Sequence, residues 1–154
     1  MEPINLLIKP ASSLCNLRCK YCFYFDVAAC REIKSYGIMK TEILEEIVKK
    51  TLIEADGYCS FAFQGGEPTL AGLDFYKQLL EFQKKYNYKN LDIYNSVQTN
   101  GYLLNQEWAD FFAKNNFLVG LSLDGNEKTD DFHRVNTENK GSFAEIMNTV
   151  RIFN

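Results

Sequence analysis

The sequence has no apolar run that reaches the roughly 18 residues needed to span a membrane. Residues 1–5 (MEPIN) lack the positive region and following apolar stretch of a secretory signal, so we expect a cytoplasmic protein. There is no basic cluster and the net charge is −3, which argues against a nucleic-acid partner. Low-complexity tracts, Pro-rich linkers and internal repeats are also absent.

The composition indicates one globular domain. The chain has 154 residues, of which 46% are hydrophobic and 24% charged, so disorder of the bulk of the chain is excluded. Five cysteines are present, an odd number, and three of them fall within eight residues. This arrangement is a poor disulfide framework and is typical of a metal site.

Short apolar segments alternate with helical stripes along the chain. Four segments are typical of buried strands: residues 5–9, 60–63, 91–97 and 117–123. Between and after these segments, apolar residues recur at helical spacing in four stretches: residues 43–52, 75–83, 108–112 and 143–150. Strands that alternate with helices predict an α/β fold with a parallel sheet of about four β/α units.

Four candidate N-cap residues suggest where the helices begin. Thr41 and Asp74 are predicted to cap the first two helices, and Asn105 the third. Ser142 and Glu145 have the spacing of a capping box for the last helix.

The end of the chain bears on its organisation. The last helical stripe continues to Asn154 without a stop signal. Four units are too few to close an eight-fold barrel, which takes roughly 200 residues or more. We therefore expect a partial (β/α) barrel in which residues 1–154 are a fragment of a longer protein; the competing expectation is a complete small doubly wound domain.

Three cysteines lie directly after the first predicted strand. Cys15, Cys19 and Cys22 have the spacing C-x3-C-x2-C. Thiolates are the usual ligands of iron–sulfur clusters. Three cysteines on a short loop can each take one iron of a cubane, which leaves the fourth iron open for chemistry, as in open catalytic metal sites.

Two alternatives fit the same cysteines. The loop could bind zinc, with Cys30 or His133 as the fourth ligand. It could also hold an electron-transfer cluster completed by Cys30 or Cys59. Structural zinc loops more often pair C-x2-C with a second such pair, which the sequence lacks. We expect Cys30 and Cys59 to be ordinary small apolar residues.

Polar segments follow the other predicted strands. Gln64-Gly65-Gly66-Glu67-Pro68 offers two glycines that allow close approach of a ligand, beside a carboxylate that suits a cation. Residues 98–101 (QTNG) and 122–125 (SLDG) come after the next two strands; alone, each is typical of a turn. Because sites in α/β folds lie beyond the carboxyl ends of strands, we expect these segments to meet.

A further polar stretch, residues 130–134, is predicted to be a loop. It ends at Arg134, whose guanidinium can grip a carboxylate bidentately. We interpret His133, the single histidine, as a loop or packing residue.

The cysteine spacing, with the aromatic Tyr21 before the third cysteine, resembles the radical S-adenosylmethionine (SAM) superfamily. The resemblance implies that Cys15, Cys19 and Cys22 hold a [4Fe–4S] cluster whose open iron chelates SAM, and that one electron cleaves SAM to a 5′-deoxyadenosyl radical. It also implies contacts with SAM. Gly66, with Gly65 and Glu67, would bind its ammonium, Arg134 would bind its carboxylate, Ser122 would contact SAM as well, and Tyr21 would lie near the adenine.

A narrower resemblance covers nearly the whole chain. Several segments resemble anaerobic sulfatase-maturating enzymes: residues 7–13, 22–24, 35–39, 59–72, 94–96, 98–101 and 118–122. The resemblance implies an oxidoreductase that converts a cysteine or serine of a sulfatase to Cα-formylglycine. It also implies a low-potential electron donor such as ferredoxin or flavodoxin, and a C-terminal region with two further clusters and the catalytic base. Residues 1–154 would be the N-terminal part of the core domain, so no base is assigned here.

Two other functions remain open on these residues. The chain could belong to a radical SAM maturase of another peptide. It could also be a non-catalytic iron–sulfur module or a truncated remnant that binds a cluster without cleaving SAM.

Overall fold

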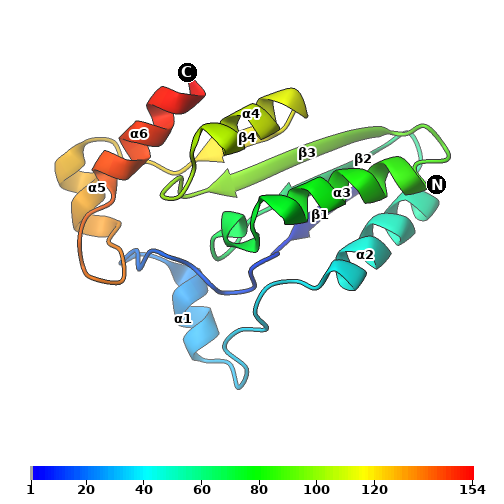
Figure 1. The fold of residues 1–154 in the computed structure, drawn as a ribbon. Helices are drawn as coiled ribbons and strands as arrows, with labels where there is room; N and C mark the ends of the chain where they lie inside the picture. Colours follow the sequence, from blue (N-terminus) through cyan, green and yellow to red (C-terminus); the bar gives the residue numbers. More distant parts are fainter. Residues whose placement is uncertain (1) are drawn as a thin grey trace.

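A computed structural model describes residues 2–154, which form a four-stranded parallel sheet (Figure 1). The strands stand side by side in chain order, and the order does not return to the first strand, so the sheet is open. In register, Leu6 lies beside Phe61 and Phe61 beside Asn95. The strands are β1 (Ile4–Ile8), β2 (Tyr58–Phe63), β3 (Asp92–Thr99) and β4 (Leu118–Leu121). The predicted parallel α/β fold is confirmed.

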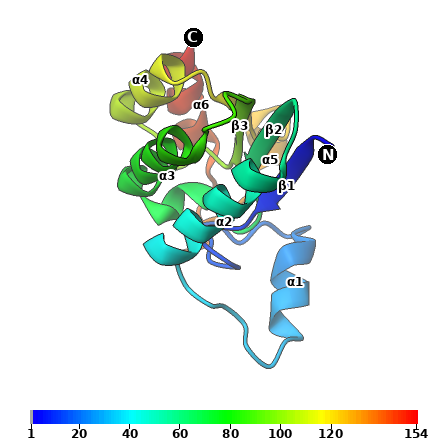
Figure 2. The same cartoon turned by 90° about the vertical axis from the view of Figure 1, so that its right-hand side faces the viewer.

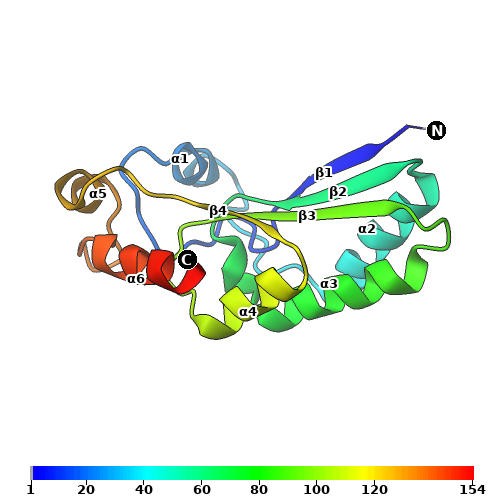
Figure 3. The ribbon, with the colours of Figure 1, turned by 90° about the horizontal axis from the view of Figure 1, so that it is seen from above.

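Six α-helices and one short 3-10 helix are described in residues 2–154. They are α1 (Phe23–Ala29), α2 (Thr41–Glu54), η1 (Pro68–Ala71), α3 (Leu73–Tyr86), α4 (Gln106–Lys114), α5 (Glu127–His133) and α6 (Phe143–Phe153). Helices α2, α3 and α4 lie on the same face of the sheet (Figures 2 and 3). No helix of the described residues is long and apolar enough to cross a membrane.

The core lies between this face and the three helices. Strand β2 alternates its side chains, so Cys59, Phe61 and Phe63 are fully buried while the residues between them are not. Tyr76 of α3 sits among several rings, with Phe63 and Trp108 in edge-to-face contact at 5.3 and 5.5 Å between centroids. This packing holds the strands rigid and fixes where their carboxyl ends, and the loops after them, stand.

The helix starts only partly follow the predicted caps. Asn105 does cap α4, since its Oδ1 accepts from the Trp108 amide at 3.2 Å. Thr41 and Asp74 lie inside the first turns of α2 and α3 instead of at the caps. Ser142 occupies the cap position of α6 without a capping hydrogen bond, because its hydroxyl serves other acceptors.

Candidate functional site

The three predicted ligands lie on the loop between β1 and α1. This loop turns tightly after β1, and is anchored at its far side where the Arg18 amide donates to the Val135 carbonyl at 2.6 Å. Leu17 is buried and pairs with Asn136 in an isolated bridge. The loop is therefore held between β1 and the segment that follows α5, at the end of the sheet where the strands finish (Figure 1).

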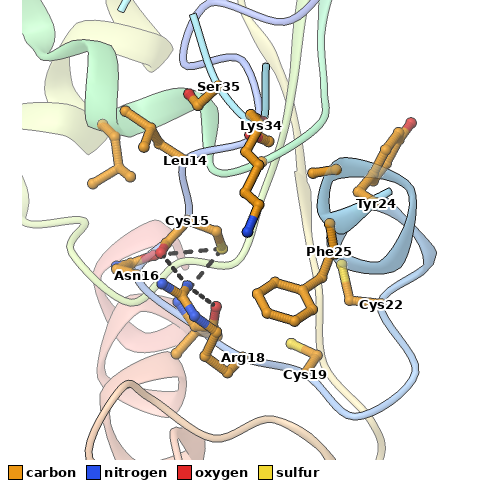
Figure 4. A pocket seen from close by; sticks show the side chains of 16 residues that line it. Leu14, Cys15, Asn16, Arg18, Cys19, Cys22, Tyr24, Phe25, Lys34 and Ser35 are labelled. Atoms are coloured by element: carbon orange, nitrogen blue, oxygen red, sulfur yellow. Dashed lines mark hydrogen bonds between the residues drawn. The ribbon is translucent and has the colours of Figure 1, made fainter. Parts of the chain in front are cut away.

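The thiols of Cys15, Cys19 and Cys22 are free, partly buried and turned toward a common space (Figure 4). They line two adjoining cavities, one of about 530 Å³ and one of about 260 Å³. The larger cavity is also lined by Arg18, Phe25 and other residues of α1 and its flanks. Cys30 is exposed at the end of α1, and Cys59 is buried in β2; neither lines these cavities.

Burial raises the pKa of two of these thiols, Cys15 and Cys19. It raises the pKa of Cys19 to about 11, against the opposing effect of the nearby Arg134. Burial also raises the pKa of Cys15, although the Leu17 amide hydrogen bond lowers it. Because only thiolates bind metal, loading iron must displace protons from this loop.

The turn after β2 packs directly against the cysteine loop. Gly66 has a φ of +61°, and a Cβ there would lie 2.4 Å from the Leu14 carbonyl oxygen. Gly65 has a φ of +100° and faces the side chain of Lys9. The Glu67 amide then donates to the Leu14 carbonyl at 2.8 Å. Glycine is required at Gly66 so that the two loops can touch.

The sequence suggested that the carboxylate of Glu67 is free to bind a cation, but in the structure it is already occupied. It is buried, with 1% of the residue exposed. Its Oε1 accepts from the Thr69 amide at 3.0 Å and from the Thr69 and Thr99 hydroxyls at 2.7 and 2.8 Å, while Oε2 accepts from the Asn100 amide at 2.7 Å. The side chain thus ties the end of β2 to the end of β3.

Ser122 follows β4 and is held by β3. The Gln98 amide group donates to the Ser122 hydroxyl at 3.0 Å. Gly120 makes room for this contact, since a Cβ there would lie 2.2 Å from the Gln98 side-chain oxygen. The ends of β3 and β4 therefore carry a hydrogen-bonded pair of polar side chains, Gln98 and Ser122.

Arg134 is the C-terminal cap of α5, so the predicted loop over residues 130–134 is wrong: residues 130–133 belong to this helix. The residue is buried, and its Nη1 donates to the Tyr21 hydroxyl at 2.9 Å. His133 packs its ring near Tyr21, at 5.8 Å between centroids, as expected of a packing residue.

All nine residues predicted for the site line the smaller cavity: Cys15, Cys19, Tyr21, Cys22, Gly65, Gly66, Glu67, Ser122 and Arg134. They come from the segments after β1, β2 and β4, at the edge where sites of α/β sheets lie. The sequence reasoning missed Asn100, which also lines it and whose side chain reaches the Cys15 sulfur at 3.7 Å. It stood in the recognised QTNG segment, but nothing local showed that it turns toward the cysteines.

The side chains around the smaller cavity suit some of the implied groups better than others. Within residues 2–154, no three His, Cys, Asp or Glu side chains converge closely enough to hold a single metal ion. Three thiols spread around a shared cavity fit a larger, multi-iron group. Beside them, the buried Arg134 lines the smaller cavity, and its positive charge fits an anionic group of a cosubstrate.

Comparison with known proteins agrees with this site. The model of the Radical SAM superfamily matches residues 10–154. A cysteine-type anaerobic sulfatase-maturating enzyme of Clostridium novyi is 54% identical over 154 residues, which is all of this chain and 41% of that enzyme. A serine-type enzyme of Bacteroides thetaiotaomicron is 36% identical over 98% of this chain and 36% of its own length.

Solved structures show the same fold. Native anSMEcpe with bound AdoMet and the Cp18Cys peptide has a TM-score of 0.91 and 54% identity, over 98% of this chain and 40% of that one. The structure with bound AdoMet alone gives 0.92. The chain thus spans about two fifths of the length of these relatives and matches part of their fold, as the expected partial barrel requires. Members of the family use a [4Fe–4S] cluster and SAM. On the family match and the identity over its whole length, the chain belongs to the radical SAM superfamily.

Proposed function

We propose that this chain holds the [4Fe–4S] cluster and SAM of a radical enzyme that oxidises a sulfatase side chain to Cα-formylglycine. The observation that carries the proposal is the gathering of the nine predicted residues around one cavity at the carboxyl ends of the strands. When bound, the two cofactors would supply a 5′-deoxyadenosyl radical by reductive cleavage of SAM.

Each residue has a role in this proposal that its surroundings support. Cys15, Cys19 and Cys22 would hold the cluster, since their sulfurs share one cavity. The main chain at Gly65, Gly66 and Glu67 would bind the ammonium group, because the Glu67 carboxylate already has its donors.

The remaining contacts would fix the other parts of SAM. Arg134 would bind its carboxylate, to which a guanidinium offers charge-assisted hydrogen bonds, and the Ser122 hydroxyl would contact SAM as well. Tyr21 is 53% exposed at the cavity and would lie near the adenine. No residue of this chain is proposed as the catalytic base. Residues 1–154 would be the N-terminal part of the core domain, and the base and two further clusters would belong to a C-terminal region.

The substrate is proposed to carry a cysteine at the oxidised position. The chain is 54% identical to cysteine-type sulfatase-maturating enzymes and 36% identical to a serine-type one. The related anSMEcpe has been solved with the Cp18Cys and Kp18Cys peptides. The reaction also needs a low-potential electron donor, such as ferredoxin or flavodoxin. We place it in the cytoplasm, where thiols stay reduced.

The test is anaerobic reconstitution with iron and sulfide, followed by dithionite, SAM and a sulfatase peptide bearing Cys or Ser. We expect 5′-deoxyadenosine from the wild type, and a brown cluster that Cys19→Ala lacks. Cys30→Ala is the matched control, because Cys30 is exposed and outside the cavity, and it should keep both.

Two results would count against the proposal. A full cluster without any 5′-deoxyadenosine would favour a non-catalytic iron–sulfur module. Formation of 5′-deoxyadenosine with other peptides, but with neither sulfatase peptide, would favour a maturase of a different substrate.

A further inference from the structure

Arg134 is fixed by groups from several segments of the chain. Its side chain is 5% exposed. Its Nη1 donates to the Tyr21 hydroxyl at 2.9 Å, and that hydroxyl donates to Asp124 Oδ1 at 3.0 Å. Its Nε lies 3.6 Å from Asp130 Oδ1, an ion pair in which the Nε has no hydrogen-bond partner. The guanidinium is therefore held from two sides before any ligand arrives.

Asp130 joins the parts of this arrangement. It is fully buried, with 0% of the side chain exposed. Its Oδ1 accepts from the Asp124 amide at 3.0 Å and its Oδ2 from the Ser142 hydroxyl at 3.3 Å. Its main-chain carbonyl accepts from the Arg134 amide at 2.7 Å. One aspartate thus connects the segment after β4, the end of α5 and the start of α6.

A buried carboxylate in this place is costly unless it is paired and hydrogen-bonded. Here its charge faces Arg134, its Oδ1 accepts from the Asp124 amide, and its Oδ2 shares the Ser142 hydroxyl with the Arg134 carbonyl. Arginine has many rotamers, and holding one of them in the free protein removes that ordering cost from ligand binding. Asp130 does not line either cavity beside the cysteines, so its effect on a ligand must pass through Arg134.

We propose that Asp130 is a positioning residue that orients the Arg134 guanidinium for the carboxylate of the cosubstrate. The inference rests on the proposed function, which assigns that carboxylate to Arg134. The neighbouring Asp131 is a natural contrast, because its Oδ1 accepts from the Phe143 amide at 2.9 Å and serves the start of α6.

The test compares the affinity for SAM with the affinity for decarboxylated SAM, which keeps the sulfonium and amine. Both are measured at equilibrium on the anaerobically reconstituted wild type, Asp130→Asn and Asp131→Asn. We expect Asp130→Asn to weaken SAM binding about tenfold, as for the loss of one interaction with a charged group, and to leave the analogue nearly unchanged. Asp131→Asn should keep the wild-type preference for SAM.

The other outcomes overturn the inference. An equal loss for both ligands in Asp130→Asn would show a purely structural role. Unchanged or tighter SAM binding would show that Asp130 does not help Arg134 or competes with the ligand. If the wild type binds neither ligand, the proposed function itself fails; if it binds both equally, the assignment of the carboxylate to Arg134 fails.

A second variant and a ligand-free measurement keep the test decisive if Asp130→Asn folds poorly. Tyr21→Phe removes only the hydroxyl that holds Nη1, from a half-exposed ring, and should lower the preference for SAM in the same sense. In the metal-free protein, the Nε–H of Arg134, one of four arginines, should exchange slowly with solvent by NMR. Exchange that is already as fast as for exposed arginines in the wild type would contradict a fixed guanidinium.

Discussion

Replacing Glu67 by glutamine tests whether its carboxylate is a structural tie between β2 and β3. The change keeps the shape of the side chain but turns one acceptor into a donor. If the amide oxygen keeps the three donors of Thr69 and Thr99, the new NH₂ group faces the Asn100 amide at the 2.7 Å now bridged by a hydrogen bond. Two donors then meet in a buried place.

The magnitude follows from this count. An unsatisfied buried donor costs about 1–3 kcal/mol, and the three remaining bonds weaken because their acceptor is no longer charged. We therefore expect Glu67→Gln to lower the free energy of unfolding by about 3 kcal/mol. With a urea m-value of about 2 kcal/mol/M, the midpoint should fall by roughly 1.5 M.

The assay is urea unfolding of the metal-free protein, followed by circular dichroism. Glu45→Gln is the control: Glu45 binds Lys85 and Tyr86 on the outside of the helices, where such pairs contribute little to stability, so its midpoint should stay near that of the wild type. A Glu67→Gln midpoint equal to that of the wild type would refute the reasoning. An unchanged midpoint combined with a loss of SAM affinity would indicate that the Glu67 carboxylate binds the ligand.

Three further predictions concern single groups. Tyr76→Phe should raise the free energy of unfolding by about 1 kcal/mol, seen as a higher melting temperature, because the buried Tyr76 hydroxyl has no partner; a lower melting temperature would reveal one. Gly66→Ala should lower the free energy of unfolding in urea by about 3 kcal/mol and prevent cluster assembly. Gly37→Ala, at a φ of +75° but with open space around it, should lower it by only about 1 kcal/mol. Equal losses would show that the contact between Gly66 and the cysteine loop does not explain the cost. In the metal-free protein, iodoacetamide should alkylate Cys19 about tenfold faster for each pH unit between 7 and 9, because a thiol with a pKa of about 11 gains thiolate throughout that range; a rate that levels off below pH 9, followed by mass spectrometry, would contradict this pKa.

The strands and most of the site could be predicted because their signals are local. A short apolar run such as residues 5–9 marks a buried strand, and Asn105 marks a helix start, whatever surrounds them. The cysteine spacing likewise marks, within eight residues of sequence, three thiols that line the smaller cavity. Parallel strands then bring the segments after them to one edge without further information.

What could not be predicted depends on partners far away in the chain. Ser142 has the sequence of a cap, yet its hydroxyl donates to the Arg134 carbonyl at 2.9 Å. Residues 130–134 look like a polar loop because their acidic side chains have no visible partner nearby in sequence, but Asp131 reaches Phe143 and Asp130 reaches Ser142. These polar groups compete for the same few donors, and only the packed fold decides which acceptor each one takes.

Local sequence spacing and distant packing both bear on Arg134, which the sequence marked only as a candidate. A carboxylate four residues earlier would, on an exposed helix, be a weak ion pair of a few tenths of a kcal/mol. Burial of both the Asp130 and Arg134 side chains makes this ion pair important, because an unpaired buried charge would be costly and the pair must form in one geometry. The same spacing that contributes little at a surface therefore becomes a device for aiming a guanidinium, and burial, which the sequence does not display, makes the difference.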